Sequence, residues 1–209
     1  MTAAFQGSLF DCDRAPELEP LAGRVRRTEL SGGAWIDLRP GWLSGADALF
    51  ERLRDVVPWR AERRQMYERV VDVPRLLCFY REQQPLPDPA LDAMKAELDA
   101  YYLAELGEPF ATAGLCFYRD GRDSVAWHGD RIGRGNTEDT MVAIVSVGDP
   151  RPLLLRPRAG GQSLAIPLGH GDLIVMGGSC QRTWEHAIAK TVKPVGPRIS
   201  IQFRPRGVR

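Results

Sequence analysis

Apolar residues recur at helical spacing in two segments of the first half of the chain. The first covers residues 46–53, and we expect its helix to be capped by Ser44 and stopped by Pro58. The second runs from Pro89 to about Glu105. Its apolar positions are Leu91, Met94, Leu98, Tyr101 and Tyr102. We therefore predict two helices.

The second half of the chain has the pattern of many short strands. From about Ala113, short apolar runs alternate with turns rich in glycine, proline and aspartate. The runs occupy residues 114–118, 142–147, 152–155, 163–166, 173–176 and 199–203. This spacing predicts a mainly β fold, an antiparallel jelly roll (double-stranded β-helix), with both helices flanking one outer face. Residues 1–34 lack periodicity, so we expect an N-terminal extension before a single domain over residues 35–209.

Composition agrees with one globular domain, because 44% of the 209 residues are apolar. The longest apolar stretches, such as residues 173–176, are too short to span a bilayer. Residues 1–6 lack the features of a secretion signal. The four cysteines are scattered without a CxxC pair: Cys12, Cys78, Cys116 and Cys180. We therefore expect a cytoplasmic protein with no membrane partner and no disulfide framework.

The charge balance by itself does not predict a nucleic-acid partner. The net charge is +1, from 28 basic and 27 acidic residues, whereas proteins that bind nucleic acids are usually more basic. Basic clusters occur at residues 60–64, at Arg131 with Arg134, and at residues 204–209. Each can equally be solvated surface.

His128 and Asp130 form an HxD pair that can bind a metal. Residues i and i+2 of a strand point to the same face, so both side chains can reach one ion. His186 can supply a third ligand from a neighbouring strand. Two histidines and one carboxylate are the donor set of non-haem iron oxygenases. The spacing alone leaves open that these histidines serve turns and ordinary hydrogen bonds.

A second HxD, His170-Gly171-Asp172, has the setting of a turn. It follows Pro167-Leu168-Gly169 and leads directly into the apolar run 173–176. Only 14 positions separate Asp172 from His186. We expect His170 to have a structural role.

The C-terminal segment 198–204 has polar residues on one face and Ile199, Ile201 and Phe203 on the other. Arg198 lies 12 positions after His186, about the length of a hairpin return, which can bring its guanidinium beside the metal. There its planar fork would suit a carboxylate of a diacid co-substrate. The alternative is an ordinary half-exposed strand with its arginines in water.

The order HxD, His and RxxxxxR resembles the AlkB family of Fe(II)- and 2-oxoglutarate-dependent dioxygenases, which dealkylate nucleic acids. The resemblance covers roughly residues 70–206. Its motifs occupy residues 72–76, 118–130, 153–158, 170–176, 181–186 and 198–205. It implies Fe(II), 2-oxoglutarate and O2 as the reacting partners, and a nucleotide-recognition lid around residues 60–85.

The resemblance also implies roles for single residues. The iron ligands would be His128, Asp130 and His186. The residues that bind 2-oxoglutarate would be Arg198, on the distal carboxylate, with Tyr118, Ser200 and Arg204. The substrate would be contacted by Arg75, Tyr80 and Arg131. His170 falls on a turn that the family also has.

The chain departs from the family pattern at three positions. Cys116 and Ser200 stand where the family often has asparagine, and Arg131 follows Asp130 where DNA-repair members often have an acidic residue. We expect a monomeric dioxygenase that demethylates N-alkylated bases in DNA, or in RNA, and releases formaldehyde, succinate and CO2. The alternatives are an oxygenase of the same fold that acts on a protein or a small molecule, and a jelly-roll module without catalysis.

Overall fold

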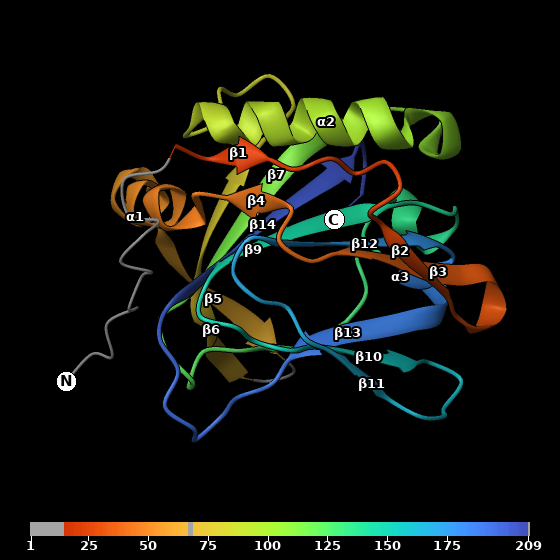
Figure 1. The fold of residues 1–209 in the computed structure, drawn as a ribbon. Coiled ribbons are helices and arrows are strands. Elements are labelled where there is room, and N and C mark those ends of the chain that lie inside the picture. The colour runs from red at the N-terminus through yellow and green to blue at the C-terminus, as the bar shows by residue number, and fades with distance from the viewer. Residues whose placement is uncertain (1–14, 67–68, 209) are drawn as a thin grey trace.

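Two antiparallel sheets form the body of the protein (Figure 1). The structure is a computed structural model that describes residues 15–66 and 69–208, without the side chains of residues 64–72. The larger sheet has the order β2 (Arg26–Glu29), β3 (Ala34–Arg39), β12 (Asp172–Gly178), β9 (Val142–Gly148), β14 (Arg198–Pro205), β7 (Phe110–Tyr118), β6 (Arg69–Tyr80), β5 (Arg60–Met66). The smaller sheet has the order β11 (Leu164–Ile166), β10 (Leu153–Pro157), β13 (Trp184–Ile188), β8 (Val125–His128). The predicted jelly roll is confirmed, and each of the six apolar runs lies wholly or largely in a strand.

Both predicted helices form, although the first begins differently. Ser44 was expected to cap α1 (Ala46–Val56), and this was wrong. Ser44 belongs to β4 (Leu43–Ser44), where it pairs with Glu17 of β1 (Glu17–Leu18). Gly45 occupies the cap position in the left-handed region, with φ 63°, and the cap has no side-chain hydrogen bond.

The second helix, α2 (Pro89–Leu106), has the ends that its sequence predicts. The Asp88 carboxylate accepts a hydrogen bond from the Ala90 amide at 2.9 Å, and proline occupies the first turn. Gly107, with φ 80°, ends the helix. Two single turns, η1 (Ser31–Gly33) and η2 (Arg134–Asn136), and the short α3 (Cys180–Thr183) complete the helical elements of the described residues.

The N-terminal segment contributes to the sheets within its described part. Residues 1–14 of the expected extension lie outside the described residues. β1 pairs with β4, and β2 adds the edge strand beside β3. The large sheet therefore begins before residue 35.

The two faces of the large sheet pack against different partners. The outer face carries both helices, as expected, through Leu49, Phe50, Leu53, Leu91, Met94 and Leu98. The inner face packs against the smaller sheet through Ile144, Ile174, Met176, Leu153, Leu155 and Ile188. Burial of each such side chain contributes about 1.5–3 kcal/mol, so both interfaces are strongly held.

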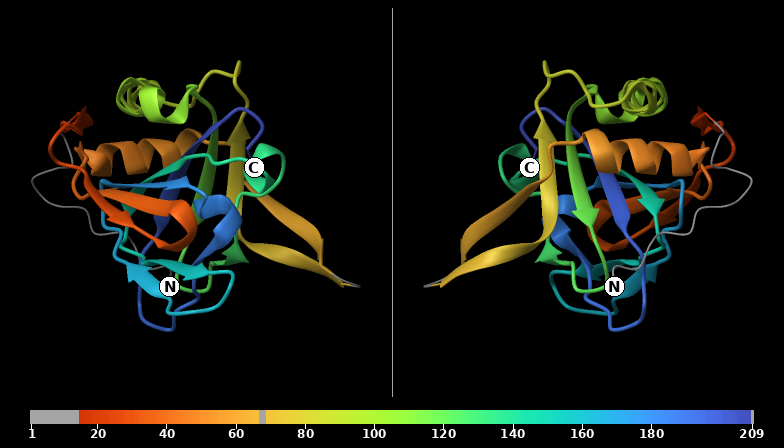
Figure 2. Two further views of the ribbon diagram at one scale, coloured as in Figure 1. Left: turned by 90° about the vertical axis from the view of Figure 1, so that its right-hand side faces the viewer. Right: turned by 90° about the vertical axis from the view of Figure 1, so that its left-hand side faces the viewer.

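The predicted lid segment contains a hairpin. β5 and β6 pair antiparallel and project from the body at the edge of the large sheet (Figure 2). The base of β6 pairs with β7, so the hairpin borders the space between the two sheets. Among the described helices, none has the length and apolar character needed to cross a bilayer.

Candidate metal centre and its cavity

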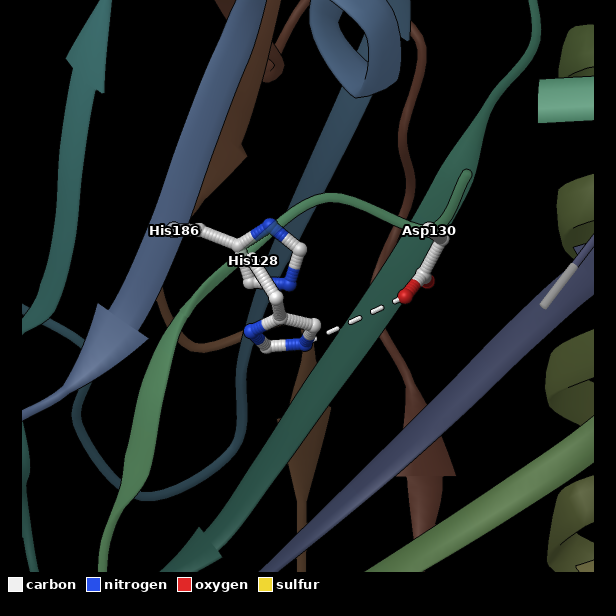
Figure 3. A group of neighbouring side chains, drawn as sticks. All are labelled: His128, Asp130 and His186. Atoms are coloured by element: carbon white, nitrogen blue, oxygen red, sulfur yellow. Dashed lines mark ion pairs between the residues drawn. The ribbon is translucent and has the colours of Figure 1, made fainter. Parts of the chain in front are cut away.

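Three side chains from two strands and one loop converge between the sheets (Figure 3). His128 ends β8, Asp130 follows two residues later, and His186 lies opposite His128 in the β8–β13 pairing. Their ligand atoms all lie within 4.8 Å of one another, and the two imidazole centroids are 4.2 Å apart. Within the described residues this is the one cluster of histidine, cysteine and acidic side chains suited to a metal. The convergence predicted for HxD and the distant histidine is therefore present.

Both imidazoles are held in the form that binds a metal. His128 Nδ1 lies 2.8 Å from the Ala126 carbonyl oxygen, so Nδ1–H donates and Nε2 keeps its lone pair. Burial lowers the pKa of His128, and burial together with the neighbouring imidazole lowers the pKa of His186 to about 3. Both rings are consequently neutral at pH 7.

Asp130 is ionised, and hydrogen bonds hold both its carboxylate and its backbone amide. Burial favours the neutral acid, but the charge of Arg204 and the two imidazoles lower the pKa of Asp130 to about 2. Arg204 Nε donates to Oδ2 at 2.7 Å, and the Asp130 amide donates to Gln181 Oε1 at 2.9 Å. Oδ1 lies 3.9 Å from His128 Nε2, on the side where an ion would sit.

A cavity of about 1000 Å³ adjoins these three residues. The polar face of β14 lines it through Arg198, Ser200, Gln202 and Arg204. The apolar residues of the same strand point to the helices. The alternative of a half-exposed strand with its arginines in water is wrong, because Arg198 and Arg204 are 1% and 8% exposed.

Arg198 is a buried cation that lacks an anion. Its Nε donates to Ser146 Oγ at 2.8 Å, and its guanidinium lies 5.4 Å from the Tyr118 ring centroid. Nη1 is buried without a hydrogen-bond partner, and no ion pair of the described residues involves Arg198. Burial lowers the pKa of Arg198, which reflects the cost of this charge. A ligand carboxylate would remove that cost, so the site suits a diacid whose other end reaches the metal.

Known proteins agree with this chemistry. The family described as the 2OG-Fe(II) oxygenase superfamily matches residues 38–204. An "Alpha-ketoglutarate-dependent dioxygenase alkB homolog 3" from Bos taurus is 30% identical over 207 residues, which cover 85% of this chain and 70% of the relative. The chain belongs to the AlkB family of 2-oxoglutarate- and Fe(II)-dependent oxygenases. It is accordingly a dioxygenase that uses Fe(II) and 2-oxoglutarate.

Further relatives fit the same family. A "DNA oxidative demethylase ALKBH2" from Arabidopsis thaliana is 28% identical over 192 residues, which cover 74% of this chain and 60% of that protein. The solved structure titled "The structure of OsALKBH1" superposes with a TM-score of 0.60 at 15% identity, and the match covers 85% of this chain and 100% of that one. At this identity the likeness shows the fold alone.

The remaining residues predicted for co-substrate binding lie in the same AlkB-family cavity. Tyr118 and Ser200 line it, and Ser200 Oγ accepts from Gln202 Nε2 at 3.2 Å. Arg204 also donates to Gln202 Oε1 at 2.6 Å. Gln202 was not predicted as a site residue, although the alternating pattern of residues 198–204 already placed it on this face.

The three residues predicted for substrate contact are divided by the structure. Arg75 and Tyr80, both on β6, line the cavity. Arg131 is exposed and outside the lining, and its Nε donates to Asn136 Oδ1 at 3.1 Å. Arg134, considered with it as a basic cluster, is paired with Glu108 and Glu138.

His170 has a structural role, as predicted for the second HxD. Its Nδ1 accepts from the Gly148 amide at 2.8 Å, and its Nε2 lies 3.1 Å from Asp47 Oδ1. Asp172 accepts from the amides of Gly41 and Gly169, at 2.8 and 2.7 Å. These bonds close a turn outside the metal cluster.

Proposed function

We propose that this enzyme oxidatively demethylates N-alkylated bases in DNA, or in RNA, with release of formaldehyde, succinate and CO2. The observation that carries the proposal is one cavity that holds a two-histidine, one-carboxylate cluster together with a buried guanidinium lacking an anion. The choice of a nucleic-acid substrate is supported by the relatives, one of which is named a DNA oxidative demethylase.

The iron ligands in this proposal are His128, Asp130 and His186. When bound, Fe(II) and 2-oxoglutarate would, with O2 as the oxidant, supply the oxidising chemistry: one oxygen atom would enter succinate as CO2 is lost, and the other would hydroxylate an N-methyl group that then leaves as formaldehyde. The neutral imidazoles and the ionised carboxylate are present without any proton having to leave. Hydrogen bonds with Arg204 and Gln181 hold Asp130 in place, and this fixes the position of its carboxylate as a metal ligand.

Arg198 would bind the distal carboxylate of 2-oxoglutarate. Its Nη1 has no hydrogen-bond partner among the described residues, and Ser146 fixes the plane of its fork through Nε. Tyr118 covers the guanidinium, and Ser200 adds a hydroxyl to the same wall. Arg204, already paired with Asp130, would lie beside the carboxylate end that reaches iron.

The substrate base would enter from the side of the β5–β6 hairpin. The metal cluster lies between two sheets, and Asp130 and His186 are 5% and 6% exposed, so a base stacked in a duplex cannot reach it. The base must be flipped out or single-stranded. Arg75 and Tyr80 would contact the base within the cavity, and the exposed Arg131 would contact the phosphate backbone outside it.

The test incubates the enzyme with Fe(II), 2-oxoglutarate and single-stranded oligonucleotides that each carry one N-methylated base. Mass spectrometry of the oligonucleotide and assays of formaldehyde and succinate measure the products. We expect equimolar loss of methyl groups and gain of succinate, and none with Asp130→Ala. Succinate formation that no methylated oligonucleotide stimulates would overturn the nucleic-acid assignment and favour a protein or small-molecule substrate.

A further inference from the structure

The part of the cavity left for substrate is positively charged. Among the side chains that the structure describes, and apart from the Arg204–Asp130 ion pair, the charged lining residues are Arg60, Arg75, Arg81 and Arg198 with one carboxylate, Glu62. Arg198 is assigned to 2-oxoglutarate, and the charges of Fe²⁺ and of the 2-oxoglutarate dianion cancel. Three guanidinium groups therefore face the substrate against a single carboxylate.

Arg75 is the most enclosed of these three guanidinium groups. Arg60 and Arg81 are exposed, whereas Arg75 is half-buried. Its Nη1 donates to the Ser124 carbonyl oxygen at 3.1 Å, and its Nε is buried without a hydrogen-bond partner. A guanidinium can only donate hydrogen bonds, so Arg75 offers donors and no acceptor to whatever occupies the cavity.

At the rim of the cavity, the described residues near the metal cluster add no further carboxylate. Ile132, two residues after Asp130, is 71% exposed and lines the cavity, and so does Phe79, which is 38% exposed. Both are large apolar side chains at the mouth of a charged site. They can pack against a flat ring, but they cannot neutralise a cation or accept a hydrogen bond from an amino group.

N-methylated bases differ in the charge of the ring and in the groups beside the methylated nitrogen. Methylation at N3 of cytosine or N1 of adenine uses a ring lone pair, so the product is a cation with an exocyclic amino donor. Methylation at N3 of thymine or uracil replaces a proton, so the ring stays neutral and the methylated nitrogen lies between two carbonyl acceptors. A cationic base inside a cavity of like charge is disfavoured by about tenfold or more, because interior charges are poorly screened.

We infer that this cavity selects neutral bases whose methylated nitrogen lies between carbonyl groups, such as 3-methylthymine or 3-methyluracil, over cationic bases such as 3-methylcytosine or 1-methyladenine. The inference rests on the proposed function and adds the class of base. Arg75 is the specificity-determining donor, and Ile132 adds no carboxylate to the rim.

The experiment compares two single-stranded oligonucleotides that differ only in carrying 3-methylthymine or 3-methylcytosine, at one salt concentration. The measured quantity is the ratio of their kcat/KM values, together with the ratio of their dissociation constants for the metal-free protein. For the wild type we expect both ratios to favour 3-methylthymine by about tenfold or more.

Two substitutions test the electrostatic cause. Ile132→Glu places a carboxylate on the rim and should lower the preference about tenfold, mainly by improving 3-methylcytosine. Val192→Glu is the matched control, because Val192 is another exposed β-branched residue but does not line the cavity, and the preference of this variant should equal that of the wild type. Arg75→Met should also lower the preference, whereas Arg75→Lys, which keeps the charge, should restore most of it.

The possible results distinguish the inferred base preference from the proposed demethylase function. Demethylation with a preference for 3-methylcytosine, or a preference that Ile132→Glu and Arg75→Met leave unchanged, overturns the inference while the proposed function stands. Absence of demethylation of every methylated oligonucleotide overturns both. If Arg75→Met fails to fold, the comparison of Ile132→Glu with Val192→Glu still tests whether charge at the rim determines the base preference.

Discussion

Replacement of Arg198 by methionine should weaken 2-oxoglutarate binding and, at the same time, stabilise the protein that lacks 2-oxoglutarate. Without its co-substrate the enzyme buries a guanidinium that is 1% exposed and that, among the described residues, has no ion-pair partner and no hydrogen-bond acceptor for Nη1. Replacement of buried charges by apolar side chains stabilises proteins by about 1–4 kcal/mol in favourable cases. Loss of one partner of a buried charge pair costs about 2–5 kcal/mol of binding.

These values translate into two measurements. The Michaelis constant for 2-oxoglutarate, from succinate formation, should rise by roughly 30-fold to several thousand-fold. Thermal unfolding without 2-oxoglutarate should shift upward by about 2–4 °C for each kcal/mol gained. Saturating 2-oxoglutarate should raise the melting temperature of the wild type but not of the variant. The Michaelis constant and the melting temperature of Arg198→Lys should lie between those of the wild type and Arg198→Met, because a lysine ammonium is a point charge and cannot form the paired hydrogen bonds of a guanidinium.

Arg151→Met provides the matched control. Arg151 is also buried, at 2% exposure, but its guanidinium donates to the carbonyl oxygens of Asp120, Asp123 and Ala189. Its removal should lower the melting temperature and leave the Michaelis constant for 2-oxoglutarate unchanged. An Arg198→Met variant that melts below the wild type and binds 2-oxoglutarate normally would refute the reasoning.

Three further predictions concern the metal cluster. Asp130→Ala should abolish succinate formation, because it removes the only anionic member of the cluster, and full activity would refute the ligand assignment. Gln181→Ala should weaken iron binding by about 10- to 100-fold, measured by titration with Fe(II), because the Asp130 amide loses its acceptor; unchanged affinity would show that Gln181 does not position the ligand. Metal-free protein should lose stability as the pH falls below about 6.5, because the unfolded chain protonates His186 there while the folded chain resists until about pH 3. The expected slope is about 1.4 kcal/mol per pH unit in denaturant unfolding, and His186→Asn should reduce it.

Local spacing in the sequence determined which side chains share a face. The HxD spacing keeps Asp130 two residues after His128, just beyond the end of β8, and the alternation of residues 198–204 separated the cavity-facing arginines from the apolar residues under the helices. The same kind of pattern located the two long helices and six of the strands, but not β8 or β13. These features depend on the helical and strand periods alone, which is why a single sequence predicts them.

Tertiary structure alone decided how distant residues meet. Gln181 behind Asp130, Ser146 beside Arg198, and Ile132 with Phe79 at one rim join positions about 50 residues apart that no local period relates. The wrong prediction of a helix cap at Ser44 has the same cause. Strand pairing of Ser44 with the distant Glu17 outweighed the local preference of serine for a helix start. Strand order sets such contacts, and strand order depends on how the whole chain packs.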